Sequence, residues 1–270
     1  MKGGISNTRR AHIDALHRTL KGPFTVREAA TALRLPLAET RQLLSSFFSR
    51  GWLSRVRRGL YVTVPLGASA PSEWRADGWV VATKLFSPGY VGGWSACEHW
   101  SLTEQVFRDV LVFTTRPIRK SRIEIQGMPF FLRSIPASHL FGLTPVWRDG
   151  VKTTVSDSSR TLVDLLDDPS LGGGIAHVGE IVRAYFESSH RNDAVLLGYL
   201  GRFHSRSTYK RLGYIVESLG IPAERLLSEC SKKQSQGLVA LDPAVRARGR
   251  ILKRWRLRVN VDLSTIAARS

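Results

Sequence analysis

Cysteine is scarce in this sequence. Only Cys97 and Cys230 occur among the 270 residues, and they lie far apart along the chain. Two cysteines exclude a disulfide framework, and they also exclude a zinc site built from several cysteines. We therefore expect both to be small buried apolar residues.

Long apolar runs are absent as well. No stretch approaches the roughly 18 to 20 apolar residues that cross a bilayer, and the charged residues 1–30 lack the apolar segment of a secretory signal. Hydrophobic residues make up 43% of the chain and charged residues 23%, a balance that is typical of a folded globular protein. The sequence predicts a cytoplasmic protein without membrane contact.

Acidic residues are few compared with basic ones. The chain has 22 Asp and Glu against 40 Lys and Arg, which gives a net charge of +18. Residues 1–66, the first basic pole, hold 12 basic and 3 acidic residues, and residues 202–258, the second basic pole, hold 14 and 4. The segment between them is nearly neutral, with 13 basic and 14 acidic residues. Such clustering favours a polyanionic partner, usually nucleic acid. For the second pole, solvated helix faces and a protein-binding surface stay open as alternatives.

Three short helices are predicted within the first basic pole. An apolar stripe at helical spacing predicts a helix over residues 8–20. Thr25 and Glu28 have the spacing of a capping box at the start of a second helix. Pro36 suits the first turn of a third helix, over residues 37–50.

The third helix has two contrasting sides. Its predicted buried side carries Leu37, Leu44, Phe47 and Phe48. The opposite side carries a guanidinium, an amide and small hydroxyls, contributed by Arg41, Gln42, Ser45, Ser46 and Ser49. Such a surface packs poorly, but it suits hydrogen bonding to base edges and phosphates in a major groove. We predict that these five residues contact DNA.

A basic hairpin follows the third helix. Residues 52–62 predict two short strands around a turn that contains Arg58 and Gly59. Arg55, Arg57 and Arg58 would repel one another near the tip without an anion nearby, so we predict that they contact DNA. Three helices and a basic hairpin are typical of a winged helix-turn-helix, whose third helix enters the major groove while the hairpin lies on the backbone or minor groove. A three-helix protein-interaction module with a solvated hairpin is the alternative.

Small residues between positions 65 and 72 predict a boundary between two domains. We therefore divide the chain into a winged helix-turn-helix domain, residues 1–66, and a C-terminal domain, residues 67–270. The second domain is predicted to be mixed α/β, with a small sheet and then a helical half that ends in a basic tail, so the fold class is α+β. The predicted strands are 109–114, 123–126, 130–135, 151–155 and 259–263, the last returning to the sheet, and the predicted helices are 74–86, 94–102, 158–167, 175–188, 193–203, 205–219 and 223–230.

No catalytic motif is complete. Gly172 to Gly174 lack the Lys-Ser/Thr pair of a phosphate-binding loop. Asp109 and Glu124, on neighbouring predicted strands, resemble the acids of metal-dependent nucleases, but Gln126 stands where those enzymes carry a lysine. A winged-helix metal-dependent nuclease is therefore an alternative only. We predict no catalytic residue, no metal site and no cofactor.

Two charged pairs in the C-terminal domain are expected to serve the fold. Arg160 and Asp164 have the spacing of a helical ion pair. Arg211 and Glu217 flank Gly213, which allows close helix packing.

Several motifs, in their order along the chain, resemble the AbiEi antitoxin family. The motifs are Arg58-Gly59-Leu60-Tyr61-Val62, Tyr90 to Ala96, His99-Trp100-Ser101-Leu102, Val112-Phe113-Thr114-Thr115, Asp157 to Asp164 and Arg211 to Glu217. The resemblance implies a bacterial two-domain protein whose winged helix represses its own operon by binding promoter inverted repeats. It also implies a C-terminal domain that counteracts a nucleotidyltransferase-like toxin, AbiEii, without a stable complex, in abortive infection of phage.

Residues and resemblance together predict a DNA-binding autorepressor and antitoxin of a type IV toxin–antitoxin system. The expected partners are double-stranded operator DNA with inverted repeats and an AbiEii-like toxin. A plain transcription factor without antitoxin activity is a second alternative, and the sequence leaves monomer and dimer equally open.

Overall fold

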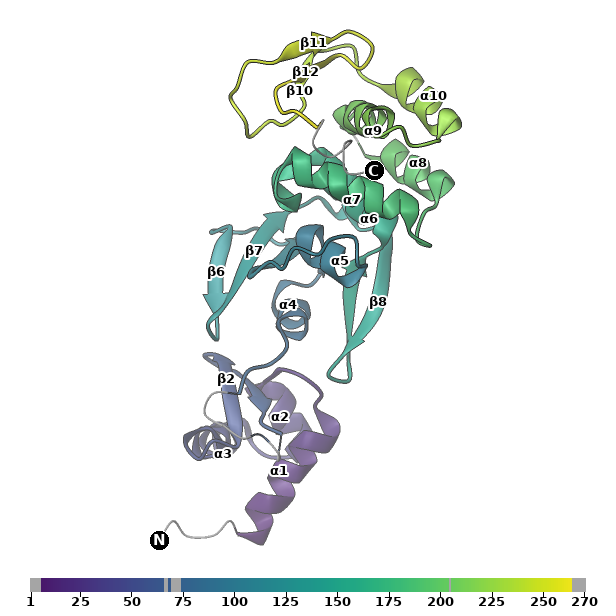
Figure 1. Ribbon diagram of the computed structural model, residues 1–270. Coiled ribbons are helices and arrows are strands. Elements are labelled where there is room, and N and C mark those ends of the chain that lie inside the picture. Colours follow the sequence, from purple (N-terminus) through teal and green to yellow (C-terminus); the bar gives the residue numbers. More distant parts are fainter. Residues whose placement is uncertain (1–5, 66–67, 69–73, 204, 264–270) are drawn as a thin grey trace.

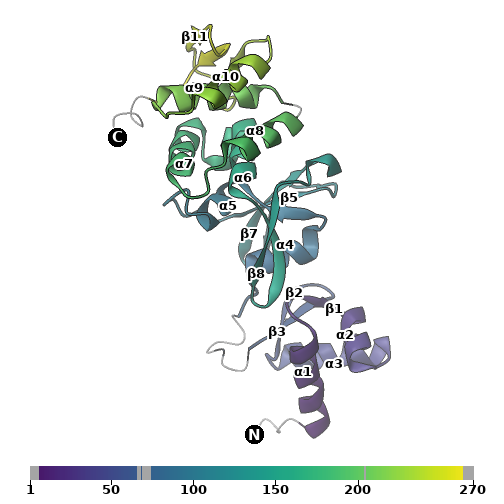
Figure 2. The same cartoon turned by 90° about the vertical axis from the view of Figure 1, so that its right-hand side faces the viewer.

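The computed structural model describes residues 6–65, 68, 74–203 and 205–263. Figure 1 shows an elongated stack with the N-terminal segment at one end, a central sheet and a layer of helices in the middle, and a small sheet at the other end. The view in Figure 2 shows the same order of layers. We call residues 6–65 the N-terminal module and residues 74–263 the body.

The N-terminal module consists of helices around a small sheet. Its elements are α1 (Asn7–Thr19), β1 (Phe24–Thr25), α2 (Val26–Leu33), α3 (Leu37–Ser49), β2 (Leu53–Arg57) and β3 (Leu60–Thr63). The strands are antiparallel in the order β1-β3-β2. The first and third predicted helices are confirmed to within one residue at each end, whereas β1 has too few residues to show a strand period.

The capping box at the start of α2 is confirmed. The Thr25 hydroxyl accepts a hydrogen bond from the backbone N–H of Glu28, and the Glu28 carboxylate accepts one from the backbone N–H of Thr25 at 2.7 Å. Ala29 on the next turn is fully buried against Leu16, Leu44 and other core residues. Its small side chain lets the helices pack closely.

A mixed sheet forms the centre of the body. Its strands are β4 (Gly89–Val91), β5 (Val110–Thr114), β6 (Arg122–Ile125), β7 (Met128–Ser134), β8 (Leu143–Arg148) and β9 (Val151–Ser156). They lie in the order β6-β7-β5-β4-β9-β8. Four of these strands were predicted, so the prediction of a small sheet missed β4 and β8. β8 is an edge strand that contains Pro145, and a proline is tolerated at an edge although it weakens the sequence signal of a strand.

Helices cover both faces of this sheet. Val112 of β5 packs in one apolar cluster with residues of α4 (Gly78–Phe86), whereas Leu111 and Phe113 pack in another cluster with α5 (Gly93–His99) and the later helices. The split follows from the alternation of side chains along a strand. α4 begins later than the predicted residue 74 because the Asp77 carboxylate caps it, accepting hydrogen bonds from Trp79 and Val80 N–H.

The remaining helices form a layer beyond the sheet. They are α6 (Ser158–Asp167), α7 (Ile175–Glu187), α8 (Asp193–Arg202), α9 (Ser207–Ser218) and α10 (Glu224–Lys233), with short 3-10 helices at Ala137–His139 and Pro169–Gly172. Each of these five α-helices was predicted, with ends that differ by at most three residues. Their apolar sides share one cluster, which explains why helical periodicity was visible in the sequence.

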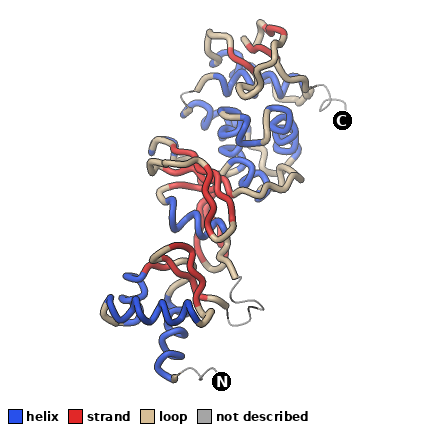
Figure 3. Tube along the Cα trace, turned by 90° about the vertical axis from the view of Figure 1, so that its left-hand side faces the viewer, coloured by secondary structure: helices blue, strands red, loops and turns tan. Residues whose placement is uncertain are grey.

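A small sheet lies at the far end of the body. It contains β10 (Val239–Ala240), β11 (Arg250–Leu252) and β12 (Leu257–Val259), in the order β10-β12-β11. Figure 3 shows strands in three separate places, the module, the central sheet and this far end. The prediction that residues 259–263 return to the central sheet was therefore wrong. Leu257 and Trp255 are fully buried, and the chain stays beside α9 instead.

The β2–β3 hairpin joins the module to the body. Val56, Leu60 and Val62 share an apolar cluster with Trp79 and Val81 of α4. Beside this cluster, the amide group of Gln126 donates a hydrogen bond of 2.8 Å to the Ser54 hydroxyl. One face of the hairpin is thus covered by the body. Across the described ranges, no helix has the length and apolarity needed to cross a membrane.

Candidate nucleic-acid interface

α3 presents a polar ridge on the surface of the module. Arg41, Gln42, Ser45 and Ser49 are exposed and Ser46 is half-buried, whereas Thr40, Leu44 and Phe47 on the opposite side are fully buried. The structure therefore brings the predicted helix residues together on one accessible side. Within the described part of the chain, no hydrogen bond or ion pair engages the side chains of Arg41 and Gln42.

The hydroxyl of Ser49, unlike those of Ser45 and Ser46, takes part in a hydrogen bond within the described residues. It donates a hydrogen bond of 2.9 Å to the backbone carbonyl of Ser46. Its lone pairs stay available as acceptors, while its proton satisfies the C-terminal turn of α3. Arg41, Gln42 and Ser45 therefore form the central part of the ridge that is open to a partner.

Of the three predicted hairpin arginines, Arg55 is the one whose side chain contacts α3, whereas Arg57 and Arg58 lie at the tip of the β2–β3 hairpin. Arg55, Arg57 and Arg58 are all exposed. The Arg55 guanidinium lies over the ring of Phe48 at 4.7 Å from its centroid, which joins β2 directly to the C-terminal end of α3. Arg55 therefore borders the C-terminal end of the polar ridge, and Arg57 and Arg58 follow at the exposed tip of the same hairpin.

Leu37 and Phe48 were predicted to be buried, and that prediction was wrong. Each is 38% exposed. Leu37 is the first residue of α3, so its side chain precedes the packed turns of the helix. Phe48 lies at the flank, because Leu44 and Phe47 already fill the core, and its ring meets Tyr61 of β3 edge-on and supports Arg55.

An irregular register shapes the hairpin tip. Arg55 pairs with Tyr61 and Arg57 with Leu60, so Val56 is an extra residue on β2. This bulge turns Val56 into the interface with the body while the arginines on either side stay exposed. Gly59 in the turn has a φ of 77°, a left-handed conformation that glycine adopts without strain.

Two more arginines border the ridge. Arg34 lies between α2 and α3 with a φ of 54°, and Arg50 ends α3 with its guanidinium 5.6 Å from the Trp52 ring. Both are exposed. Sequence reasoning counted them only as part of the basic pole. Arg34 lies just before the predicted third helix and Arg50 at its end, and these positions could have identified both as candidate site residues.

Acidic side chains of the module are mostly neutralised. Asp14 pairs with Arg18 within α1, and Glu28 pairs with Lys84 of the body. Burial alone would raise the pKa of Glu28, but hydrogen bonds from Lys84 and Thr25 outweigh it and lower the pKa below its ordinary value. The surface near α3 therefore keeps a positive surplus, with Glu39 as the remaining carboxylate of the module.

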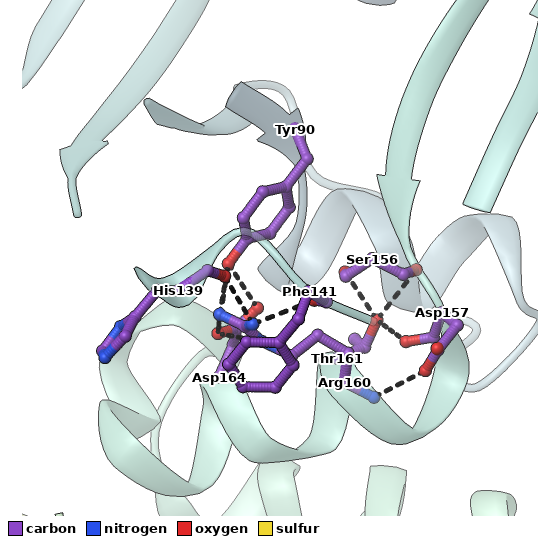
Figure 4. Close-up of polar contacts among 8 residues, drawn as sticks. All are labelled: Tyr90, His139, Phe141, Ser156, Asp157, Arg160, Thr161 and Asp164. Atoms are coloured by element: carbon purple, nitrogen blue, oxygen red, sulfur yellow. Dashed lines mark hydrogen bonds and ion pairs between the residues drawn. The ribbon is translucent and has the colours of Figure 1, made fainter. Parts of the chain in front are cut away.

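Arg160 lies at the centre of a buried polar cluster in the body (Figure 4). Its guanidinium donates to Asp164 at 3.0 and 3.1 Å, to the carbonyls of His139 and Phe141 at 2.7 and 3.0 Å, and to the Tyr90 hydroxyl at 2.7 Å. The Tyr90 hydroxyl donates in turn to Asp164 at 3.0 Å. All five N–H groups of the arginine are used, so the predicted structural ion pair is confirmed.

Burial governs the protonation of this cluster. It raises the pKa of Asp164 to about 6, although the charge and hydrogen bonds of Arg160 act in the opposite direction. It also raises the pKa of Tyr90 well above its ordinary value. Arg160 is fully buried and Asp164 is 3% exposed, so the cluster supports the fold from inside.

Arg211 and Glu217 do not contact each other, but each has structural partners, as expected. The Arg211 guanidinium donates to the carbonyl of Leu166 at 2.7 Å, at the end of α6, and to the carbonyl of Leu241 at 2.9 Å. Glu217 accepts a hydrogen bond from the indole N–H of Trp255. A side chain at Gly213 would place its Cβ 2.2 Å from the Trp255 ring, so this glycine permits the close contact.

Of the two acids that suggested a nuclease, Asp109 has a structural partner and Glu124 of β6 is exposed. The Asp109 carboxylate pairs with Arg122 at 2.7 Å, and Gln126 bonds to Ser54 of the module. Among the described residues, no group of three or more His, Cys, Asp or Glu side chains is arranged to hold a metal ion. Both cysteines are fully buried, as predicted.

No protein-family model matches the chain, and no curated protein matches its sequence. A solved structure with a similar fold is the crystal structure of the RV2827C protein from Mycobacterium tuberculosis. The similarity covers 94% of this chain and 92% of that chain, at a TM-score of 0.62 and 16% sequence identity. This likeness extends over the module and the body, and at this identity it concerns the fold alone.

Proposed function

We propose that the chain is a sequence-specific DNA-binding repressor whose N-terminal module is a winged helix-turn-helix. The observation that carries this proposal is the accessible ridge of Arg41, Gln42 and Ser45 on α3, with the exposed Arg55 of β2 beside its C-terminal end. An amide and a guanidinium held on one helix face can form the paired hydrogen bonds that distinguish base pairs in a major groove.

In this proposal the module divides the work between two elements. α3 lies in the major groove, where Arg41, Gln42, Ser45 and Ser46 face base edges and Ser49 faces the backbone. Arg55, Arg57 and Arg58 contact phosphates or the adjacent minor groove. The Phe48 ring keeps Arg55 next to the helix, so both elements address the same stretch of duplex.

We further propose that the body carries an antitoxin function directed at a nucleotidyltransferase-like toxin, and that the operator contains inverted repeats. Support for this part comes from the resemblance of the motifs to the AbiEi family. Inspection of the neighbouring open reading frame gives a first test, because a transcription factor without antitoxin activity would have no toxin gene beside it.

Binding to two duplexes tests the DNA proposal. One duplex contains the promoter of the protein's own gene, and the other has a scrambled sequence. Gln42→Ala should weaken promoter binding by about 1–3 kcal/mol and leave binding to the scrambled duplex unchanged. Arg57→Ala should weaken both duplexes alike and reduce the salt slope by about 1. Equal losses on both duplexes for Gln42→Ala would remove α3 as the reading element.

A matched control keeps this comparison specific. Arg108 is exposed on the neutral part of the body, and no side-chain partner is recorded for it among the described residues. Arg108→Ala removes the same charge as Arg57→Ala outside the proposed interface, so it should leave both affinities unchanged. A loss as large as that of Arg57→Ala would show that overall charge, not the tip, drives binding.

Rescue from the toxin tests the antitoxin proposal. The full chain is used, since the hairpin packs on the body and removal of the module would expose Trp79 and Val81. The double variant Arg41→Ala/Gln42→Ala should lose repression but still protect cells that express the neighbouring toxin. Failure of the wild-type chain to protect would contradict the antitoxin role and leave the DNA proposal intact.

A further inference from the structure

The end of the body opposite the module carries a concentrated positive charge. From here on, the basic hairpin means residues 244–258, which are distinct from the β2–β3 hairpin of the module. They comprise a loop followed by β11, its turn and the first two residues of β12. This segment holds seven Lys and Arg and no Asp or Glu. In Figure 1 it lies at the far end of the stack from α3.

Most of these cations face solvent. Arg246, Arg248, Arg250, Lys253, Arg254 and Arg258 are exposed. Arg254 pairs with Glu217, and the half-buried Arg256 donates to the Ser235 carbonyl at 3.3 Å. The other five have no carboxylate partner in the ranges that the structure describes. Charges of one sign held this close repel one another unless an anion lies between them.

The hairpin is held firmly in place. Trp255 in its turn is fully buried, donates its indole N–H to Glu217 and lies against Gly213 of α9. Leu257 is fully buried beneath the strands. Ile251 and Arg258 are register partners on the opposite, outward side, and Ile251 is 59% exposed. The cations of β11, its turn and β12 are therefore presented by an anchored hairpin, and Asn260 holds the preceding loop by donating to the Val245 carbonyl at 2.7 Å.

The residue types indicate which part of a nucleic acid this surface fits. Proteins that bind single strands stack the bases on exposed aromatic rings. Trp255 is the only aromatic residue between positions 220 and 263, and it is buried. Residues 244–258 themselves contain no Asn or Gln. Guanidinium groups without stacking rings suit the phosphates of a duplex, and such contacts are independent of sequence.

We propose that the basic hairpin is a second DNA contact, which grips the phosphate backbone of duplex flanking the operator while α3 reads the operator itself. This inference rests on the proposed DNA-binding function. Because the hairpin and α3 lie at opposite ends of the stack (Figures 1 and 2), the contact requires flanking duplex beyond the segment that α3 touches.

The test uses duplexes of two lengths and two charge-matched variants of the full chain. The hairpin variant is Arg246→Gln/Arg248→Gln/Arg250→Gln. The control variant, Arg108→Gln/Arg119→Gln/Lys120→Gln, removes three exposed cations from the neutral part of the body. One duplex carries the operator alone, and the other carries it with long flanks on both sides. Thermal unfolding of both variants checks that the fold is kept.

Loss of three phosphate contacts should reduce the salt slope on the long duplex by about 2–3, since each contact contributes about 0.9. Affinity for the long duplex should fall at least tenfold at about 0.15 M salt, whereas affinity for the short duplex should stay within twofold. The control variant should match the wild type on both. A hairpin variant that behaves like the control on the long duplex would overturn the inference.

Two further arms separate the possible outcomes. Double-stranded RNA of the same length is titrated in parallel; a loss on RNA with none on DNA would also overturn the proposal. Discrimination between operator and scrambled flanked duplex is measured with Arg41→Ala/Gln42→Ala. If Arg41→Ala/Gln42→Ala loses discrimination and the hairpin variant binds like the wild type, only the hairpin inference is contradicted. If Arg41→Ala/Gln42→Ala keeps discrimination and the hairpin variant binds the long duplex more weakly, the role of α3 in reading the operator is contradicted and the hairpin contact is supported.

Discussion

Arg57 in β2 and Arg160 in α6 carry the same charged group in opposite surroundings. Arg160 is fully buried, and all its N–H groups have acceptors at 2.7 to 3.1 Å. Arg57 is exposed, and no hydrogen bond or ion pair of its side chain is recorded in the described ranges. The arginines that give the chain its positive charge therefore have two different roles. Arginines like Arg160 complete the interior, and arginines like Arg57 are left for a partner.

Removal of Arg160 should have the largest effect on stability. Arg160→Met leaves Asp164 and Tyr90 buried without their main partner, which should lower the free energy of unfolding by about 3–5 kcal/mol. Urea unfolding at pH 7 measures the change. The double variant Arg160→Met/Asp164→Leu removes the stranded carboxylate and should recover part of the loss. A single variant within about 0.5 kcal/mol of the wild type would show that the cluster is not structural.

Gly213→Ala should have the next largest effect. The Cβ of the new alanine would lie 2.2 Å from the Trp255 ring, so the basic hairpin of residues 244–258 must shift away from α9. Overpacking of this kind costs about 1–3 kcal/mol, which thermal unfolding detects. Gly198→Ala on α8 is the control, because no atom lies within 4 Å of a Cβ placed there. Equal stability of the two variants would contradict the close packing.

Arg57→Ala should affect DNA binding and not stability, the opposite of the effect expected for Arg160→Met. Its stability should stay within about 0.5 kcal/mol of the wild type, as for surface substitutions generally. Its salt slope for DNA binding should fall by about 1. Unfolding and salt titrations on the same preparation check both values. A loss of stability without a change in slope would place Arg57 with the structural arginines.

The contact between Glu28 and Lys84 should give the smallest effect, and one that depends on pH. The pKa of Glu28 is lowered in the folded state, so its contribution is present above its unfolded pKa of about 4.3 and is lost as the pH falls through the lower folded value. An exposed ion pair contributes at most about 1 kcal/mol. Wild type and Glu28→Gln should therefore differ slightly at pH 7 and converge in acid. A gap that widens in acid would contradict this sign.

Sequence reasoning succeeded where the signal was long and local. The helices that became α3, α6 and α7 were predicted to within one residue at each end, because each spans several turns with one apolar side. The polar ridge followed from the same periodicity. β4 and β10 are too short to show a strand period, and the proline in β8 masked it.

Contacts between distant segments could not be predicted in this way. The hydrogen bond from Gln126 to Ser54 and the ion pair of Lys84 with Glu28 join residues that are 72 and 56 positions apart. They depend on how the module docks on the body, for which no local pattern exists. The exposure of Phe48 also depends on a contact outside its own helix, because its ring packs against Tyr61 and Arg55 of the β2–β3 hairpin.

The placement of α3 in a DNA groove is tested most directly by a cross-link. Burial raises the pKa of Cys97 and raises that of Cys230 to about 12, so neither native thiol should react. Ser45→Cys then supplies one accessible thiol on the ridge, and Ser228→Cys on α10 supplies an exposed control. The account predicts a disulfide between Ser45→Cys and a thiol tethered to a base in the major groove of the operator. Cross-linking no greater than that of Ser228→Cys would contradict it.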